Sequence, residues 1–259
     1  TLHVHPFSSS ETSDYFENNE ISNNDINDIH QTCKGHPGYL SAVKRLFNAG
    51  RSWESLGASL PQELPEIFEL EWEAVADLDK SAELALAVVA FSKTNMTLKD
   101  ISIMLGADDE ELRSSLSGLP FIEISSLEDN VGFASASFKK FAAQKLKRKE
   151  AEVSESIVKI LESDPEADAA LLHIPNYLST AGQSDKLLDF LSHSHFVRLI
   201  ERSKSISTVL KQINLGLSVA TKNERVLPLC LAKSSLCEVS AIAGLESEVA
   251  ANAAVGDNG

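Results

Sequence analysis

The fold of this chain is decided by Thr97–Leu146, which reads TLKDISIMLGADDEELRSSLSGLPFIEISSLEDNVGFASASFKKFAAQKL. Two short helices are predicted, over Thr97–Leu105 and Asp108–Ser117, because each segment begins with a capping residue that is followed three positions later by an acid. The apolar period then changes from helical to alternating, which predicts a hairpin of Phe121–Ser125 and Val131–Ala134. We therefore expect a helical domain that carries a small β-hairpin.

A third helix is predicted just before this stretch, over Ala82–Phe91, with Ser81 as its cap. The order helix–helix–helix–hairpin is that of a winged helix. The helix that would enter the DNA major groove opens with four acids and offers a single base, Arg113. The acids are Asp108, Asp109, Glu110 and Glu111. Because DNA affinity depends on neutralising phosphates, these carboxylates would repel a duplex, and the charge indicates a module for protein or intramolecular contacts.

Composition and charge narrow the class of protein further. The 259 residues are 43% apolar and 24% charged, as in ordinary globular proteins. The net charge of -15 argues against general binding to nucleic acid or to anionic membranes. Residues 51–130 are strongly acidic, whereas residues 131–150 are basic, so these two parts either dock on each other or are solvated helix faces. The bases are Lys139, Lys140, Lys145, Lys147, Arg148 and Lys149.

The cysteines and the ends of the chain bear on its location. Cys33, Cys230 and Cys237 have neither disulfide-framework nor metal-ligand spacing, which is typical of a reducing cytosol. No apolar run reaches the roughly 18 residues of a membrane span, and no secretory leader is present, so we predict a cytoplasmic protein without membrane contact. The opening Thr1–Pro6 reads like the end of a strand that leaves another domain, so we expect a piece of a larger protein.

An elbow is predicted between two of the N-terminal helices. Helices are expected over Glu11–Asn18, Ile26–Lys34 and Gly38–Asn48. Gly35 ends the second of them and Pro37 begins the third, which predicts a rigid corner with bare backbone. Such a corner can lie flat against a planar ligand such as a nucleobase, although an ordinary helix–helix corner is the simpler interpretation.

Other polar groups are interpreted as structural. Five acids without a catalytic partner are interpreted as a solvated helix face, namely Glu63, Glu66, Glu69, Glu71 and Glu73. His30, Cys33 and His36 are three apart, but a Gly-His-Pro break interrupts their helix and no fourth ligand is near, so no metal site is predicted. His193 and His195 are still weaker candidates for a metal site. Since the chain has no GxxxxGK[ST] loop and no distinct Ser, His and Asp arrangement, no catalytic residue is predicted.

Beyond Glu150 the chain is predicted to be helical throughout, with short loops. The helices are expected over 151–163, 166–180, 186–191, 196–202, 205–221 and 226–244. We interpret them as stacked helical hairpins of the solenoid type. The Ala/Asn/Gly-rich tail 250–259 is expected to fray.

Four segments together follow the pattern of one known class of protein. Gly35-His36-Pro37 is a GxP element, His5-Pro6-Phe7-Ser8 combines a strand end, a proline and a helix start, and residues 131–142 contain F-x-S-x-S-F-x-x-F. With the helical segment 171–191, they resemble the STAND class of P-loop NTPases, the signalling ATPases that include NACHT and NB-ARC proteins. In that class a helical lid with a GxP element follows the ATPase core, and a winged helix and helical repeats come next. This order covers almost the whole chain.

The resemblance implies ATP or ADP as the cofactor of the parent protein, with Gly35 and Pro37 as nucleotide contacts near the adenine. The histidine with which the winged helix of the class senses the nucleotide phosphate has no counterpart, because Ser135 takes its place. Direct sensing at that position is therefore not implied. The P-loop and the acidic Mg-binding strand would lie upstream of Thr1, so this chain alone is not expected to hydrolyse ATP.

We therefore predict a mainly α protein in four parts. They are the end of the NTPase core with the helical lid (1–60), the winged-helix domain (61–150), the helical repeats (151–249) and the flexible tail (250–259). The expected function is that of a regulatory, signal-transducing arm, which couples nucleotide state to the sensing of a protein or ligand by the repeats. The implied partners are the upstream P-loop NTPase core, the sensed molecule and further copies of the parent in an oligomer. Members of the class serve in antiviral defence or transcriptional control.

Two alternatives remain open at this point. The first is a non-enzymatic adaptor whose winged helix docks proteins. The second, less favoured, is a nucleic-acid-binding regulator that uses the basic helix 139–149, although its Phe138 and Phe141 are expected in the core.

Overall fold

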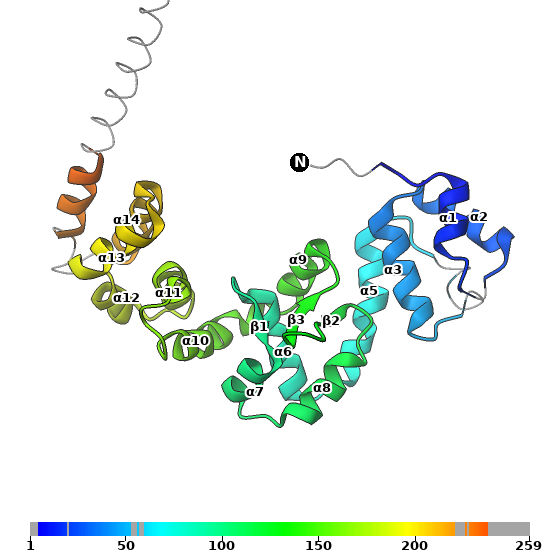
Figure 1. Cartoon of the computed structure of the whole chain (residues 1–259), viewed down its shortest axis with the longest axis horizontal. Helices are drawn as coiled ribbons and strands as arrows, with labels where there is room; N and C mark the ends of the chain where they lie inside the picture. The colour runs from blue at the N-terminus through cyan, green and yellow to red at the C-terminus, as the bar shows by residue number, and fades with distance from the viewer. Residues whose placement is uncertain are drawn as a thin grey trace, which may run out of the picture. The chain divides into compact units, whose positions relative to one another are not determined.

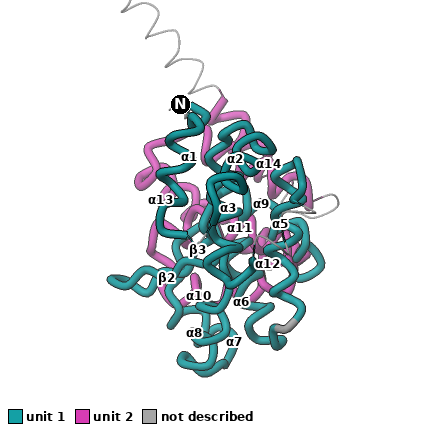
Figure 2. Tube along the Cα trace, turned by 90° about the vertical axis from the view of Figure 1, so that its right-hand side faces the viewer, with its two compact units in different colours: residues 1–149 teal, residues 150–259 magenta. Residues whose placement is uncertain are grey.

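The structure is a computed structural model that describes residues 5–19, 21–52, 56, 60–220, 226 and 228–237. The chain divides into two compact units, Thr1–Lys149 and Glu150–Gly259 (Figure 2). Helices dominate both units, and a small antiparallel sheet lies in the first (Figure 1). The predicted fold class, mainly helical with a small hairpin and further helices after it, is confirmed. The strand expected at the start of the chain and the tail 250–259 lie outside the described residues.

Three helices open the first unit: α1 (Ser9–Tyr15), α2 (Asn23–Cys33) and α3 (Pro37–Asn48). The first two begin earlier than predicted because serine side chains cap them. Ser8 Oγ accepts the N–H of Glu11 at 3.3 Å, and Ser22 Oγ accepts the N–H of Asp25 at 3.2 Å. The apolar faces of these helices share one core, which contains Phe16, Ile29, Leu40 and Leu46.

The rest of the first unit combines helices with the sheet. Its elements are α5 (Leu64–Trp72), the 3₁₀ helix η2 (Glu73–Asp77), α6 (Lys80–Phe91), β1 (Met96–Thr97), α7 (Leu98–Leu105), α8 (Asp109–Ser117), β2 (Ile122–Ile124), β3 (Asn130–Phe133), α9 (Ala136–Lys145) and the 3₁₀ helix η3 (Lys147–Lys149). Three helices followed by a hairpin is the order that the sequence predicted. The cap of α6 is a correction: Asp79 and not Ser81 caps it, since Asp79 Oδ1 accepts the N–H of Ala82 at 2.7 Å.

The sheet has one strand more than the predicted hairpin. Its order is β1-β3-β2 with antiparallel neighbours, and β3 places Val131 opposite Met96 on one side and opposite Ile124 on the other. β1 has only two residues, which is too short to show an alternating pattern in the sequence.

Six aromatic rings fill the core between α5, α9 and the hairpin. They are Phe68, Trp72, Phe121, Phe133, Phe138 and Phe141. The centroids of Phe121 and Phe138 lie 4.4 Å apart, and those of Phe68 and Phe138 lie 4.9 Å apart. Aromatic contacts of this kind add to the large apolar area that each ring buries. Because α5 supplies Phe68 and Trp72, this helix belongs to the same core as the hairpin.

The second unit is helical in the part that the structure describes. Its elements are α10 (Glu150–Leu161), α11 (Asp168–Thr180), α12 (Ser184–Phe190), α13 (His193–Ser203) and α14 (Ile206–Val219), followed by helical residues 228–237. α11 lies at the centre, since it contacts α10, α12, α13 and α14 (Figure 1). None of the described helices of the chain is long and apolar enough to cross a membrane.

Candidate functional site

The elbow between α2 and α3 is formed as the sequence indicated, except that Lys34 and not Gly35 ends α2. α2 ends at Lys34 in the left-handed conformation (φ 51°), and Gly35 follows with φ 71°. The N–H of His36 then donates to the Cys33 carbonyl at 3.0 Å, and Pro37 is the first residue of α3. The fixed φ of proline suits this helical position, where no N–H is needed.

Gly35 is buried and serves packing. Its carbonyl accepts the N–H of Phe7 at 2.8 Å, and a Cβ added at Gly35 would lie 2.0 Å from the Phe7 carbonyl oxygen. The glycine is therefore required by the segment that precedes α1. The accessible surface of the elbow is formed instead by Pro37, which is half-buried, with His36 and Gly38 exposed beside it.

Tyr39 makes one hydrogen bond within the elbow and another to the rest of the unit. The N–H of Tyr39 donates to His36 Nδ1 at 3.3 Å, so the histidine caps α3. The Tyr39 hydroxyl donates to the Pro61 carbonyl, and burial raises the pKa of Tyr39 above its ordinary value. The elbow is thus tied to the segment that leads into α5.

The three residues considered as metal ligands have separate partners. His30 Nδ1 lies 2.9 Å from Thr12 Oγ1, and the Cys33 thiol donates to the His30 carbonyl at 3.8 Å. Burial raises the pKa of Cys33, and His36 is the cap of α3. Within the described ranges, no group of three or more His, Cys, Asp and Glu residues could hold a metal ion.

A buried ion pair connects α3 to α5. Arg45 Nε donates to Glu71 Oε1 at 2.7 Å, and a second guanidinium nitrogen donates to Glu71 Oε2 at 3.0 Å. The Glu71 side chain has no exposed surface, and that of Arg45 is 14% exposed. Burial raises the pKa of Glu71, and the arginine partly offsets this effect. The prediction of a solvated face was therefore wrong for Glu71, because this acid lies on the same helix face as Ile67 and pairs with an arginine of α3.

The other four acids of that run are exposed, as predicted. The basic segment 139–149 is divided between α9 and η3, and two acids of the first unit pair with its lysines. Lys145 Nζ lies 2.6 Å from Glu69, and Lys149 Nζ lies 3.0 Å from Glu83. Lys139 Nζ donates to the Ser92 carbonyl at 2.8 Å, and burial lowers the pKa of Lys139. Three of the six bases of residues 139–149 thus make contacts within the first unit.

A buried polar network joins three helices of the second unit. Pro175 lies inside α11 and has no N–H to donate to the carbonyl of Leu171, four residues earlier. The side-chain amide of Gln212 on α14 donates to that carbonyl at 2.9 Å. Its oxygen lies 2.6 Å from Nε2 of His195 on α13. Gln212 therefore replaces the hydrogen bond that the proline removes.

This arrangement determines the form of His195. Because the Gln212 oxygen can only accept, Nε2 of His195 carries the proton. The other ring nitrogen of His195, Nδ1, is buried and has no hydrogen-bond partner among the described residues. Burial lowers the pKa of His195, and the nearby charge of Arg198 acts in the same direction. The ring contacts Phe190 and Phe196, and an N–H formed at Nδ1 by a second proton would have no acceptor among the described residues.

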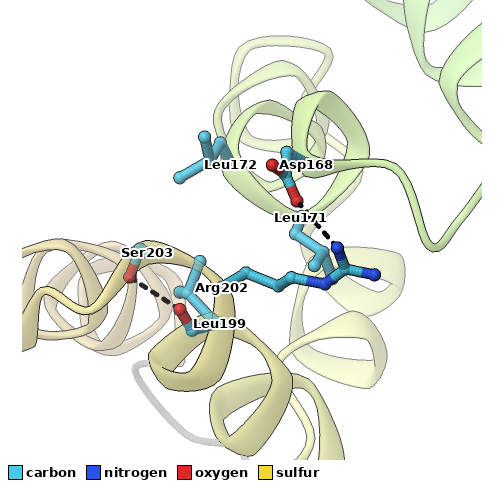
Figure 3. A pocket seen from close by; sticks show the side chains of 6 residues that line it. All are labelled: Asp168, Leu171, Leu172, Leu199, Arg202 and Ser203. Carbon is cyan, nitrogen blue, oxygen red and sulfur yellow. Dashed lines mark hydrogen bonds and ion pairs between the residues drawn. The ribbon is translucent and has the colours of Figure 1, made fainter.

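A small cavity of about 70 Å³ lies between α11 and α13 (Figure 3). Leu171, Leu172 and Leu199 form its apolar wall. Asp168 and Arg202 lie across it with an oxygen–nitrogen distance of 3.8 Å. A volume of this size is far below the roughly 300 Å³ of ordinary ligand sites. We therefore interpret the cavity as a gap in the packing between two helices.

The sequence did not single out Arg45, Glu71 or Gln212 for these roles. A signal was present for two of them. Glu71 follows Ile67 by four positions and Gln212 follows Val209 by three, so each stands on the apolar stripe of its helix. A polar residue on such a stripe is expected to have a buried partner.

Comparison with solved structures gives one informative match. The crystal structure of a Signal Transduction ATPase with Numerous Domains (STAND) protein with a tetratricopeptide repeat sensor, from Pyrococcus horikoshii, superposes with a TM-score of 0.53 and 16% sequence identity. The match covers 94% of this chain and 39% of the other, so this chain spans well under half of that protein's length. No protein-family model and no curated protein matches the sequence. The likeness is one of fold.

Proposed function

We propose that this chain is the regulatory arm of a STAND-type NTPase. In this proposal α1–α3 form a lid beside the nucleotide, α6–α9 form a winged-helix domain, and α10–α14 sense a protein or ligand. The arm contributes no bond-making chemistry. It acts because its packing against an upstream P-loop core differs between the ATP and ADP states.

The observation that carries the proposal is the extent of the shared fold. The match with the STAND protein runs over 94% of this chain and so extends over both compact units. That protein is a signal-transduction ATPase with a repeat sensor. A shared fold over this much of the chain supports the same division of labour.

The charges of the hairpin domain support an intramolecular role over DNA binding. The four acids at the start of α8, residues 108–111, are exposed. Arg113, the base beside them, lies 3.0 Å from Asp129 in the hairpin loop. A duplex would therefore meet carboxylates, and a basic protein surface is the better partner.

The proposed nucleotide contact is the accessible side of the elbow, centred on Pro37. Gly35 supports that contact from behind by allowing Phe7 to approach. The proline ring offers an apolar surface to a nucleobase, and the cofactor is ATP or ADP bound by the parent protein. The upstream core would supply the phosphate and Mg²⁺ ligands.

The test uses the intact parent protein and a fluorescent ADP analogue. Pro37→Ala keeps the helix start but removes the ring, so we expect affinity to fall roughly three- to tenfold. Pro65→Ala is the matched control, because Pro65 is an exposed proline in the first turn of α5. A parent protein that binds no nucleotide, or equal affinities for the two variants, would contradict the proposal.

A further inference from the structure

The helical run from α9 to α10 is interrupted where its sequence contains no helix breaker. α9 ends at Lys145, η3 covers Lys147–Lys149 as a 3₁₀ helix, and α10 begins at Glu150. Residues 136–161 contain neither glycine nor proline, and residues 142–152 read AAQKLKRKEAE, which are all strong helix formers. The local sequence therefore favours one continuous α-helix, whereas the structure has a break in it.

The interruption has a defined backbone conformation over residues 146–149, which we call the joint. Leu146, the cap of α9, has ψ 10°, which departs from the α-helical value of about −42°. The N–H of Lys149 donates to the Leu146 carbonyl at 2.8 Å, three residues back, whereas an α-helix uses the carbonyl four residues back. A 3₁₀ stretch inside a helical run marks either a hinge or a segment under strain. The boundary between the two compact units falls directly after Lys149.

Contacts within the first unit hold the interrupted form. Leu146 is buried in that unit. Lys145 Nζ lies 2.6 Å from Glu69 on α5, and Lys149 Nζ lies 3.0 Å from Glu83 in the first turn of α6. A 3₁₀ helix turns by about 120° per residue and an α-helix by about 100°, so converting η3 would by itself rotate Lys149 by about 60°. The Lys149–Glu83 pair therefore depends on the 3₁₀ conformation.

A continuous helix would have ion pairs of its own. Arg148 and Glu152 are four positions apart, and Lys149 and Glu152 are three apart, which is the spacing of ion pairs on an α-helix. Lys145 and Lys149 would repel each other in that form. Single ion pairs at a protein surface contribute little, and the side chains of Lys149 and Glu83 both keep exposed surface. Little free energy therefore separates the two sets of ion pairs.

We propose that the joint is a two-state element, which exchanges between the observed 3₁₀ form and a single α-helix over residues 136–161. The Lys149–Glu83 pair holds the first form. Because Glu83 belongs to the first turn of α6, the state of the joint couples the start of the second unit to the hairpin domain. This inference goes beyond the proposed function, since it depends on the contacts of the joint and holds with or without an upstream NTPase core.

The test measures the distance across the joint in the full chain. Spin labels are attached to Lys140→Cys on α9 and Glu155→Cys on α10, two exposed positions, after Cys230→Ser and Cys237→Ser remove the exposed native thiols. Double electron–electron resonance then gives the distribution of label distances. In a continuous helix, the separation of these two positions corresponds to about 22 Å between their Cα atoms. Because Leu146 departs from helical geometry, the interrupted form should give a different distance.

Matched variants show whether the Lys149 pair controls the exchange. Glu83→Gln keeps the size of the side chain but removes the charge that binds Lys149. Glu73→Gln is the control, because Glu73 also belongs to an ion pair of this unit but pairs with Arg51 and not with a residue of the joint. We expect Glu83→Gln to raise the population at the continuous-helix distance at least roughly threefold. The control should leave the distribution unchanged.

Three results would overturn this inference. The first is a single distance that is the same in the labelled chain and in both variants. The second is an equal shift in Glu83→Gln and Glu73→Gln. The third is a broad distribution without a component at the continuous-helix distance, which would show an unfolded joint. Because no nucleotide is present, the result is independent of the Pro37 test of the NTPase proposal.

Discussion

The network around Pro175 predicts a measurable coupling between two positions of the second unit. Gln212→Leu keeps a similar side-chain volume but removes the amide. The Leu171 carbonyl and the Nε2–H of His195 then lose their hydrogen-bond partners in a buried site. An unsatisfied buried polar group costs about 1–3 kcal/mol, so the free energy of unfolding should fall by roughly 2–5 kcal/mol.

Pro175→Ala should reduce this cost. The alanine supplies the N–H that α11 lacks, and this N–H can donate to the Leu171 carbonyl without help from Gln212. In the Pro175→Ala background, Gln212→Leu leaves only His195 unsatisfied. Its cost should therefore be smaller by about 1–3 kcal/mol, which is the coupling energy of a double-mutant cycle.

The assay is urea unfolding of the four proteins of this cycle, with hydrogen exchange to assign the change to α11 and α14. The new amide at position 175 should be protected from exchange. Gln144→Leu on an exposed position of α9 serves as the control and should change stability by less than about 0.5 kcal/mol. Equal costs of Gln212→Leu with and without the proline would refute the reasoning.

Three further predictions concern stability. Glu71→Ala leaves Arg45 without its acidic partner and should lower the free energy of unfolding, measured in urea, by about 3–5 kcal/mol. Glu73→Ala removes an acid from an exposed pair and should lower it by less than about 1 kcal/mol. Burial lowers the pKa of His195, so below pH 6.5 the unfolded state binds a proton at this residue more readily than the folded state does. The free energy of unfolding should therefore be constant above that pH and fall below it. If a His195→Gln variant loses the same stability on acidification, the loss does not come from His195. Gly35→Ala places a Cβ against the backbone of Phe7 at φ 71°, whereas Gly106→Ala has φ 63° but open space around its Cβ. The first variant should therefore lower the melting temperature much more than the second. Similar losses would show that the approach of Phe7 to Gly35 is unimportant for stability.

The parts of the fold that depend on neighbouring residues could be predicted from the sequence. Thr97 and Asp108 cap α7 and α8, and the change of apolar period located the hairpin. The cap of α6 was misplaced because Asp79 and Ser81 are both good capping residues, and only the backbone angles distinguish them.

The parts that depend on distant residues were out of reach. The partner of Glu71 is 26 positions away, and the backbone carbonyl that Gln212 binds is 41 positions away. The apolar stripe of α5 could have marked Glu71 as buried, but nothing local in the sequence names Arg45 as its partner. The elbow is an intermediate case, since its backbone turn was predicted but the approach of Phe7 to Gly35 was not.

The position of α5 has a consequence for how related sequences diverge. This nine-residue helix pairs with α3 through Glu71 and enters the aromatic core through Phe68 and Trp72. We expect natural variation in α5 to concentrate at Glu66, while positions 45 and 71 change together or not at all. An alignment of orthologues would then show slower sequence change in α5 than in the segments on either side of it.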